Sequence, residues 1–155
     1  MAKSSRTPLP LIRLNLVQPL LDYLDAQGMN SAPFLAKMSL TLADIANLDL
    51  FVPAAKMYQL VENLAAYSGD PYFGVHAGEK LDPFQWSPLK SAVQTSKTVG
   101  ITLLRFMEDA PLDESSVDFV LTVKGRRASF REQRFTDGGM VPRHNDGFTV
   151  AYLLT

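Results

Sequence analysis

The hydrophobic pattern changes its period near residue 117, and this change restricts the fold more than any other feature of the chain. Over 117–124 apolar residues alternate with more polar ones, which is typical of a half-buried β-strand. After Gly125-Arg126 a second strand-like stretch follows over 128–135, so the two predict an antiparallel hairpin. Because a lone hairpin is marginal in water, it needs a covering helix or a further strand. We expect Phe130 and the odd-numbered residues of the first strand to face that cover.

Helical spacing of apolar residues dominates the chain before the hairpin. It predicts a first helix over about 16–27, with Asn15 as its N-cap. Pro53 opens the strongest helical pattern and Gly69 closes it. The helical part is expected to end near Asp109. The predicted fold class is therefore α+β, with a mainly helical N-terminal half packed on an antiparallel β-hairpin or sheet.

Smaller features place the remaining helix ends. Thr41 and Asp44 have the spacing of a capping box, in which a hydroxyl and a carboxylate satisfy each other's backbone amides. Thr98 is placed to cap a helix, and Asn145 is placed to cap a final apolar one. Two short helices are expected around the capping box, and two longer ones before the hairpin.

The last residues, 148–155, form an apolar run that shows no polar ending. Terminal residues are usually poorly ordered unless they dock, and ends of domains are therefore often polar. We expect 1–8 to be a flexible polar tail and 9–155 to be one domain that is truncated at its C-terminus. The apolar face of the final run should dock on the hairpin or on a second copy of the chain.

Charge and cysteine content exclude several classes of protein. The 15 Lys and Arg residues are balanced by 16 Asp and Glu residues, for a formal net charge of -1. A domain that grips nucleic acid needs a basic surface to neutralise phosphates, so this chain is not expected to contact DNA itself. The absence of cysteine excludes disulfides and thiolate metal sites. No apolar run approaches the ~20 residues of a membrane span, and we expect a cytoplasmic protein without membrane contact.

Residue patterns for catalysis or metal binding are weak. His76, Glu79, Asp82 and His144 match no ligand spacing such as two histidines on one helix face. The chain has neither the nucleophile elbow of a serine hydrolase nor a phosphate-binding glycine loop. The sequence therefore predicts no catalytic residue, no metal ligand and no cofactor. A polar cleft with perturbed carboxylates or histidines would instead favour a small enzyme.

Aromatic residues give the candidate binding site. Trp86 lies in a loop that enters a helix, where an indole either fills the core or lines a ligand cavity. On the second strand Arg131 and Glu132 point to opposite faces, and a guanidinium facing the helices would suit a carboxylate ligand. We expect any cavity to lie between the inner face of the hairpin and the helices. Its candidate lining residues are Phe84, Trp86, Phe106, Phe119, Phe130 and Arg131.

Several short segments occur in an informative order. The segments are Leu20-Leu21 with Gly28, Val52-Pro53, 69–78 (GDPYFGVHAG), 86–89 (WSPL), 96–100 (SKTVG), 128–132 (ASFRE) and 144–146 (HND). In this order the chain resembles the N-terminal effector domain of AraC-type transcriptional regulators, in its arabinose-binding-like branch. The resemblance covers nearly the whole chain after the tail.

The resemblance implies an effector-sensing and dimerisation domain that responds to a small molecule and often forms a homodimer. In such regulators a C-terminal domain with two helix-turn-helix motifs binds DNA. That domain is absent from this chain. The resemblance therefore implies that the full regulator contacts DNA only through its C-terminal domain. No residue matches a sugar-binding position, and the resemblance does not imply arabinose. The alternative is an interaction or dimerisation module without a small ligand, which an exposed apolar face at Ile101, Leu104 and Met107 would favour.

Overall fold

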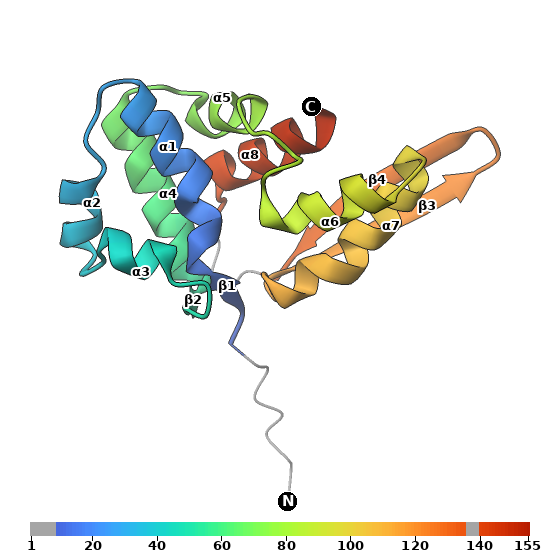
Figure 1. Cartoon of the computed structure of the whole chain (residues 1–155), viewed down its shortest axis with the longest axis horizontal. Helices are drawn as coiled ribbons and strands as arrows, with labels where there is room; N and C mark the ends of the chain where they lie inside the picture. The colour runs from blue at the N-terminus through green and yellow to red at the C-terminus, as the bar shows by residue number, and fades with distance from the viewer. Residues whose placement is uncertain (1–8, 136–139) are drawn as a thin grey trace, which may run out of the picture.

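Helices form one side of the molecule, and a long β-hairpin projects from the other with two helices lying along it (Figure 1). This computed structural model describes residues 9–135 and 140–155, and its account of 87 and 88 is limited to the backbone. The predicted tail over 1–8 lies outside the described residues. The arrangement confirms the α+β class.

The helices and strands follow each other in an order close to the predicted one. In chain order they are β1 Leu11–Arg13, the 3-10 helix η1 Leu14–Val17, α1 Gln18–Ala26, α2 Ala32–Lys37, α3 Leu42–Ala46, β2 Phe51–Pro53, α4 Ala54–Ser68, α5 Phe73–Glu79, α6 Ser87–Thr95, α7 Val99–Asp109, the 3-10 helix η2 Ala110–Leu112, β3 Val117–Lys124, β4 Arg127–Arg134 and α8 Arg143–Leu154. The end of α7 at Asp109 is where the sequence places the end of the helical part.

Helix boundaries agree with the capping signals in some places and not in others. The capping box of α3 is present. The backbone N–H of Asp44 donates to Thr41 Oγ1, and the Asp44 carboxylate accepts from the backbone N–H of Thr41. Gly69 ends α4 with a left-handed φ of 68°, which only glycine adopts without strain. The prediction for Asn15 is wrong, because a 3-10 turn precedes α1 and Val17 occupies the N-cap. The prediction for Asn145 is also wrong, since α8 begins at Arg143.

Strands β3 and β4 form the predicted antiparallel hairpin, with Leu121 opposite Phe130. The two-residue connection begins with Gly125 at a φ of 58°, a positive value that suits the first central position of a hairpin turn. Strand β1 pairs with β2 and also bridges to the residues just before β3, through Ile12 and Glu114. The segment before β3 therefore connects the hairpin to the helical side.

The C-terminal helix α8 packs against α5 and α4. Phe148 and Tyr152 are buried there, so the apolar run does dock, on helices rather than mainly on the hairpin. Glycines make the close contact with α5 possible. A Cβ placed on Gly78 would lie 2.7 Å from the Cβ of Ala151. Helices α5 and α8 are thus closer together than larger side chains would allow.

Candidate functional site

Four of the six predicted site residues belong to one aromatic cluster. The stacked rings of Phe119 and Phe130 on the hairpin lie 5.5 Å apart, and both contact Phe106 of α7. Phe106 in turn faces Tyr152, which packs 4.5 Å from Trp86 between ring centroids. Phe119 and Phe130 therefore lie on the inner face of the hairpin, as predicted. These rings pack against one another, and Trp86 also lines an open cleft.

The other two predicted residues lie outside this cluster. Phe84 is 55% exposed in the loop before α6. Arg131 is paired with Val120 on the outer, solvent-facing side of the hairpin. The hypothesis of an inward guanidinium at this position is wrong, because the register turns even-numbered residues of β4 toward the helices. Arg134, three residues further on, is the arginine that points inward.

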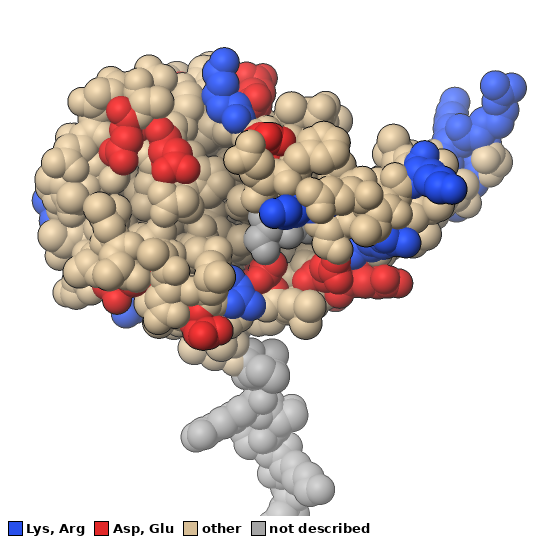
Figure 2. Space-filling model, viewed as in Figure 1, with Lys and Arg blue, Asp and Glu red and all other residues tan. Residues whose placement is uncertain are grey.

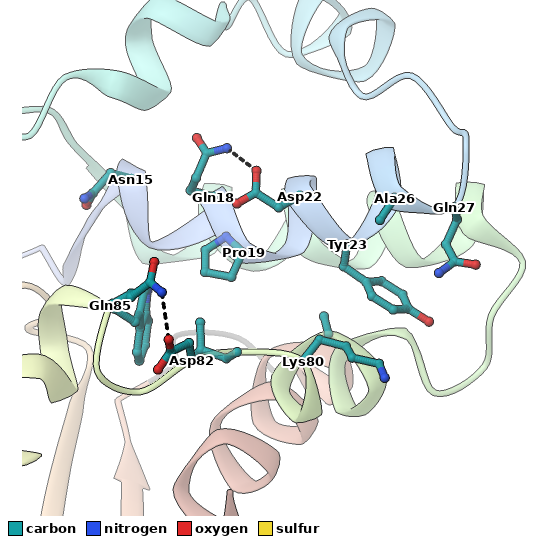
Figure 3. Close-up of a pocket in the computed structure, with 13 residues that line it drawn as sticks. Asn15, Gln18, Pro19, Asp22, Tyr23, Ala26, Gln27, Lys80, Asp82 and Gln85 are labelled. Atoms are coloured by element: carbon teal, nitrogen blue, oxygen red, sulfur yellow. Dashed lines mark hydrogen bonds between the residues drawn. The ribbon is translucent and has the colours of Figure 1, made fainter.

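A polar cleft of about 650 Å³ lies between α1 and the segment that runs from the end of α5 to the start of α6 (Figure 3). Its size falls within the range of small-molecule sites. Its lining residues are Asn15, Gln18, Pro19, Asp22, Tyr23, Ala26, Gln27, Ala77, Lys80, Leu81, Asp82, Gln85 and Trp86.

Hydrogen bonds hold several of the polar side chains on the two walls of the cleft. On α1 the Gln18 amide donates to Asp22 at 2.7 Å. On the facing loop the Gln85 amide donates to Asp82 at 2.8 Å, and the backbone amide of Phe84 donates to the same carboxylate. Figure 3 shows these two pairs on opposite walls. Both walls thus carry amide and carboxylate groups, and in Figure 3 the Gln18–Asp22 pair lies on the side of α1 away from Asp82 and Gln85.

Asn15 supplies an acceptor that has no partner. Its Oδ1 is buried, and among the described residues no donor reaches it. Buried polar atoms are nearly always hydrogen-bonded, so an orphaned oxygen at the wall of a cleft needs an explanation. In Figure 3 Asn15 lies at the same end of the cleft as Gln85. Trp86, the next residue along the chain, also lines the cleft. This oxygen is itself inaccessible to solvent, so a ligand hydroxyl or amine in the cleft would satisfy it once the Asn15 side chain turned toward the cleft.

Tyr23 connects the cleft to a second polar group. Its hydroxyl donates to Asp70, which also accepts from His76 Nδ1 at 2.7 Å. Burial, helped by the charge of Asp70, raises the pKa of Tyr23, so it stays protonated and donates. Burial opposes the ionisation of Asp70, but hydrogen bonds from His76 and the Tyr72 amide outweigh it and lower the pKa of Asp70. This wall is thus held by fixed hydrogen bonds.

A charged cluster at the base of the hairpin was not predicted. Arg134 binds Glu132 on its own strand, Asp146 of α8 at 2.6 Å and the hydroxyl of Tyr58 on α4. Glu114 lies 3.6 Å from the same guanidinium. These contacts join the hairpin to two helices. The cluster lies apart from the cleft and holds three carboxylates against one guanidinium.

Burial and this excess of negative charge alter the acidity of the cluster. Burial raises the pKa of Glu132 to about 7, with the neighbouring carboxylates adding to the effect and Arg134 opposing it. Burial also raises the pKa of Glu114, although Ser116 donates to it at 2.7 Å. Burial raises the pKa of Tyr58 to about 12. Burial therefore makes the carboxylates Glu132 and Glu114 bind protons more readily than carboxylates in water do.

The two histidines have separate partners. His76 pairs with Asp70, whereas His144 Nε2 lies 4.0 Å from Glu62. Within the described ranges, no group of three His, Asp or Glu side chains is arranged to hold a metal ion. In those same ranges no helix has the length and apolar character needed to cross a membrane.

The class to which this fold belongs follows from a family comparison. Residues 28–155 match the family described as the arabinose-binding domain of AraC transcription regulators, N-terminal. That description is of a ligand-binding regulatory domain, and an α+β domain with a polar cleft agrees with it. The chain belongs to this family. No curated protein shows significant similarity to the chain.

The sequence did not identify most residues of the cleft as candidate site residues. Gln18 and Asp22 have the spacing of an ordinary solvated helix face, and Asn15 has the composition of a helix cap. Only Trp86 carried a signal, because an indole in a loop stands out. The facing wall over 77–86 lies more than 50 positions along the chain, so its proximity to α1 depends on the packing of α5.

Proposed function

We propose that this chain is the effector-sensing domain of an AraC-type transcription factor and that the cleft between α1 and residues 77–86 binds the effector. The observation that carries the proposal is the buried, unpartnered Oδ1 of Asn15 at the wall of a cleft of about 650 Å³. Membership of a ligand-binding regulatory family supports it. In this proposal the chain performs no chemistry on the ligand.

The lining favours a small polar effector. Asp22, Asp82 and three glutamines offer hydrogen bonds, while Lys80 is the basic side chain of the lining. Pro19, Leu81 and Trp86 supply apolar surface. Such a mixture suits a molecule with several hydroxyl or amine groups and one face that packs on an indole. Of the six residues predicted from the sequence, Trp86 is the one retained in the proposed site.

Trp86 also gives a physical route from the cleft to the rest of the domain. Its ring packs on Phe148 and Tyr152 of α8, and Tyr152 contacts Phe106 beneath the hairpin. An effector that binds one position of Trp86 better than another shifts the population of these packed states. We propose that such a shift controls DNA binding by a helix-turn-helix domain of the full regulator, in the cytoplasm.

Thermal denaturation against a panel of small polar metabolites tests the proposal. A true effector raises the melting temperature by mass action and changes the emission of Trp86, the single tryptophan. Asn15→Leu should abolish both responses, whereas Asn63→Leu on α4, outside the cleft, should preserve them. A metabolite that stabilises the wild type and Asn15→Leu equally would place the site elsewhere.

The alternative of an interaction module without a small ligand has one supporting observation. Helix α7 exposes apolar side chains, with Val99 at 77%, Leu104 at 51% and Ile101 at 42% exposure. Large exposed apolar residues close together are typical of interaction surfaces. The ligand panel separates the two functions, since a pure interaction module would respond to none of its members.

A further inference from the structure

The outer edge of β3 is an unusual feature of the hairpin. Within the ranges that the structure describes, β3 pairs with β4 on one side, and on its other side β1 bridges only to the residues before it. Strand β1 begins at Leu11, directly after Pro10, which has no amide to donate. An edge of this kind presents a row of free backbone groups to another strand.

The hydrogen bonds around β3 show which backbone groups face that edge. Ser116 accepts from Phe135 on the β4 side, whereas Ser115 donates to Leu11 on the opposite side. Backbone groups of successive residues in a strand point to alternate edges. The even-numbered residues of β3 therefore bond to β4. The odd-numbered ones, from Val117 to Val123, direct their amides and carbonyls outward.

We propose that a second copy of this chain pairs with this edge, β3 against β3 in antiparallel orientation, about a two-fold axis at Leu121. In this register Leu121 lies opposite Leu121 of the partner subunit, and Phe119 lies opposite Val123 of the partner subunit. All of these are odd-numbered positions with outward backbone groups. The two hairpins then form one four-stranded sheet.

Charge selects this register. On the exposed face of β3, Asp118 lies near one end of the strand and Lys124 at the other. The two-fold axis places Asp118 opposite Lys124 of the partner subunit. It likewise places Lys124 opposite Asp118 of the partner subunit. Both are in non-hydrogen-bonded positions of the new pair, where opposite side chains come closest. Figure 2 shows that Lys and Arg gather at the free end of the hairpin, so the parallel alternative would bring like charges together.

Helix α7 lies beside this interface. It packs against β3 on the inner face of the hairpin (Figure 1). In the joint sheet the two α7 helices lie on the same face, one on each side of the two-fold axis. The inference does not rest on the proposed effector.

Sedimentation velocity of the chain over a range of concentrations tests the interface. We expect a reversible dimer whose dissociation constant rises at least tenfold in Asp118→Lys and in Lys124→Asp. The double variant Asp118→Lys/Lys124→Asp restores the opposite charges and should return to within about threefold of the wild type. Arg131→Asp is the matched control. It makes the same change of charge as Lys124→Asp, on the same face of the hairpin but on β4, and it should leave dimerisation unchanged.

A second variant tests the strand edge itself. Val123 is 66% exposed and its amide points outward, so Val123→Pro removes a donor of the dimer without removing one of the hairpin. It should yield a monomer with an unchanged circular dichroism spectrum. A wild-type chain that stays monomeric, or a dimer unaffected by both the charge reversals and Val123→Pro, would overturn the inference. An effector response from a monomer would still support the proposed function.

Discussion

Gly74 lies so close to His144 that a Cβ added to the glycine would lie 1.8 Å from the histidine's carbonyl oxygen. No atom of a flexible side chain can yield there, since the obstacle is the backbone of α8. We expect Gly74→Ala to force α5 away from α8 and to lower the free energy of unfolding by about 3 kcal/mol. Chemical denaturation measures the change.

Gly100 provides the control for that substitution. A Cβ at Gly100 meets no atom within 4 Å, and the residue lies in the first turn of α7. Gly100→Ala should therefore be neutral or stabilising by up to about 1 kcal/mol, because alanine has the better helix propensity. Equal losses at Gly74 and Gly100 would contradict the close packing of α5 and α8.

Arg134 and Arg131 lie on the same strand but should differ strongly in importance. Arg134 is the cation shared by Glu132, Asp146 and Glu114, and its side chain is only 11% exposed. Arg134→Met leaves partly buried carboxylates without a counter-charge and should cost about 3 kcal/mol of stability. Arg131→Met, on the exposed face, should change stability by less than about 0.5 kcal/mol. Urea unfolding of both variants makes the comparison.

Glu132 should make stability depend on pH. Its pKa in the folded chain is about 7, above the ordinary value of 4.5, so the folded state binds a proton more tightly than the unfolded one. The contribution is fully present below the ordinary pKa and is lost as pH rises through about 7. The pKa of Glu114, which burial also raises, acts in the same direction. Melting temperatures should therefore fall from pH 5 to pH 8.

Glu132→Gln tests the assignment of this pH dependence. The amide keeps the shape of the protonated side chain but cannot ionise, so the variant should lose less stability between pH 5 and pH 8 than the wild type. An unchanged slope would assign the effect to other groups. Glu108→Gln, at an exposed position of α7, serves as the control for a removed carboxylate.

Asn15→Leu should stabilise the chain in the absence of effector while removing its response. A buried oxygen without a partner costs free energy, and replacing it with an apolar side chain should raise stability by about 1 kcal/mol. This opposite effect on stability and binding is expected of a functional residue. A destabilised Asn15→Leu variant would indicate that the side chain has a structural partner.

The local signals in the sequence were reliable where a short segment determines its own structure. The capping box at Thr41, the glycine end of α4 and the two strands of the hairpin all occur as predicted. The period of alternation also identified Phe130 as an inward residue. The same alternation places Arg131, the neighbour of Phe130, on the outer face, so it already opposed an inward guanidinium at that position.

The sequence by itself determined the α+β class, the position of the hairpin and the membership of a regulatory family, since periodicity, turn residues and ordered motifs are local properties of the chain. The tertiary structure alone decided where a cleft opens and which charges meet. The cleft requires α1 to lie beside a loop over 77–86, and the Arg134 cluster requires the hairpin, α4 and α8 to converge. The position of the loop after α5 also depends on how closely α5 approaches α8, a distance set by the absence of side chains on Gly74 and Gly78. Packing of distant segments follows from the whole set of contacts, and no short stretch of sequence encodes it.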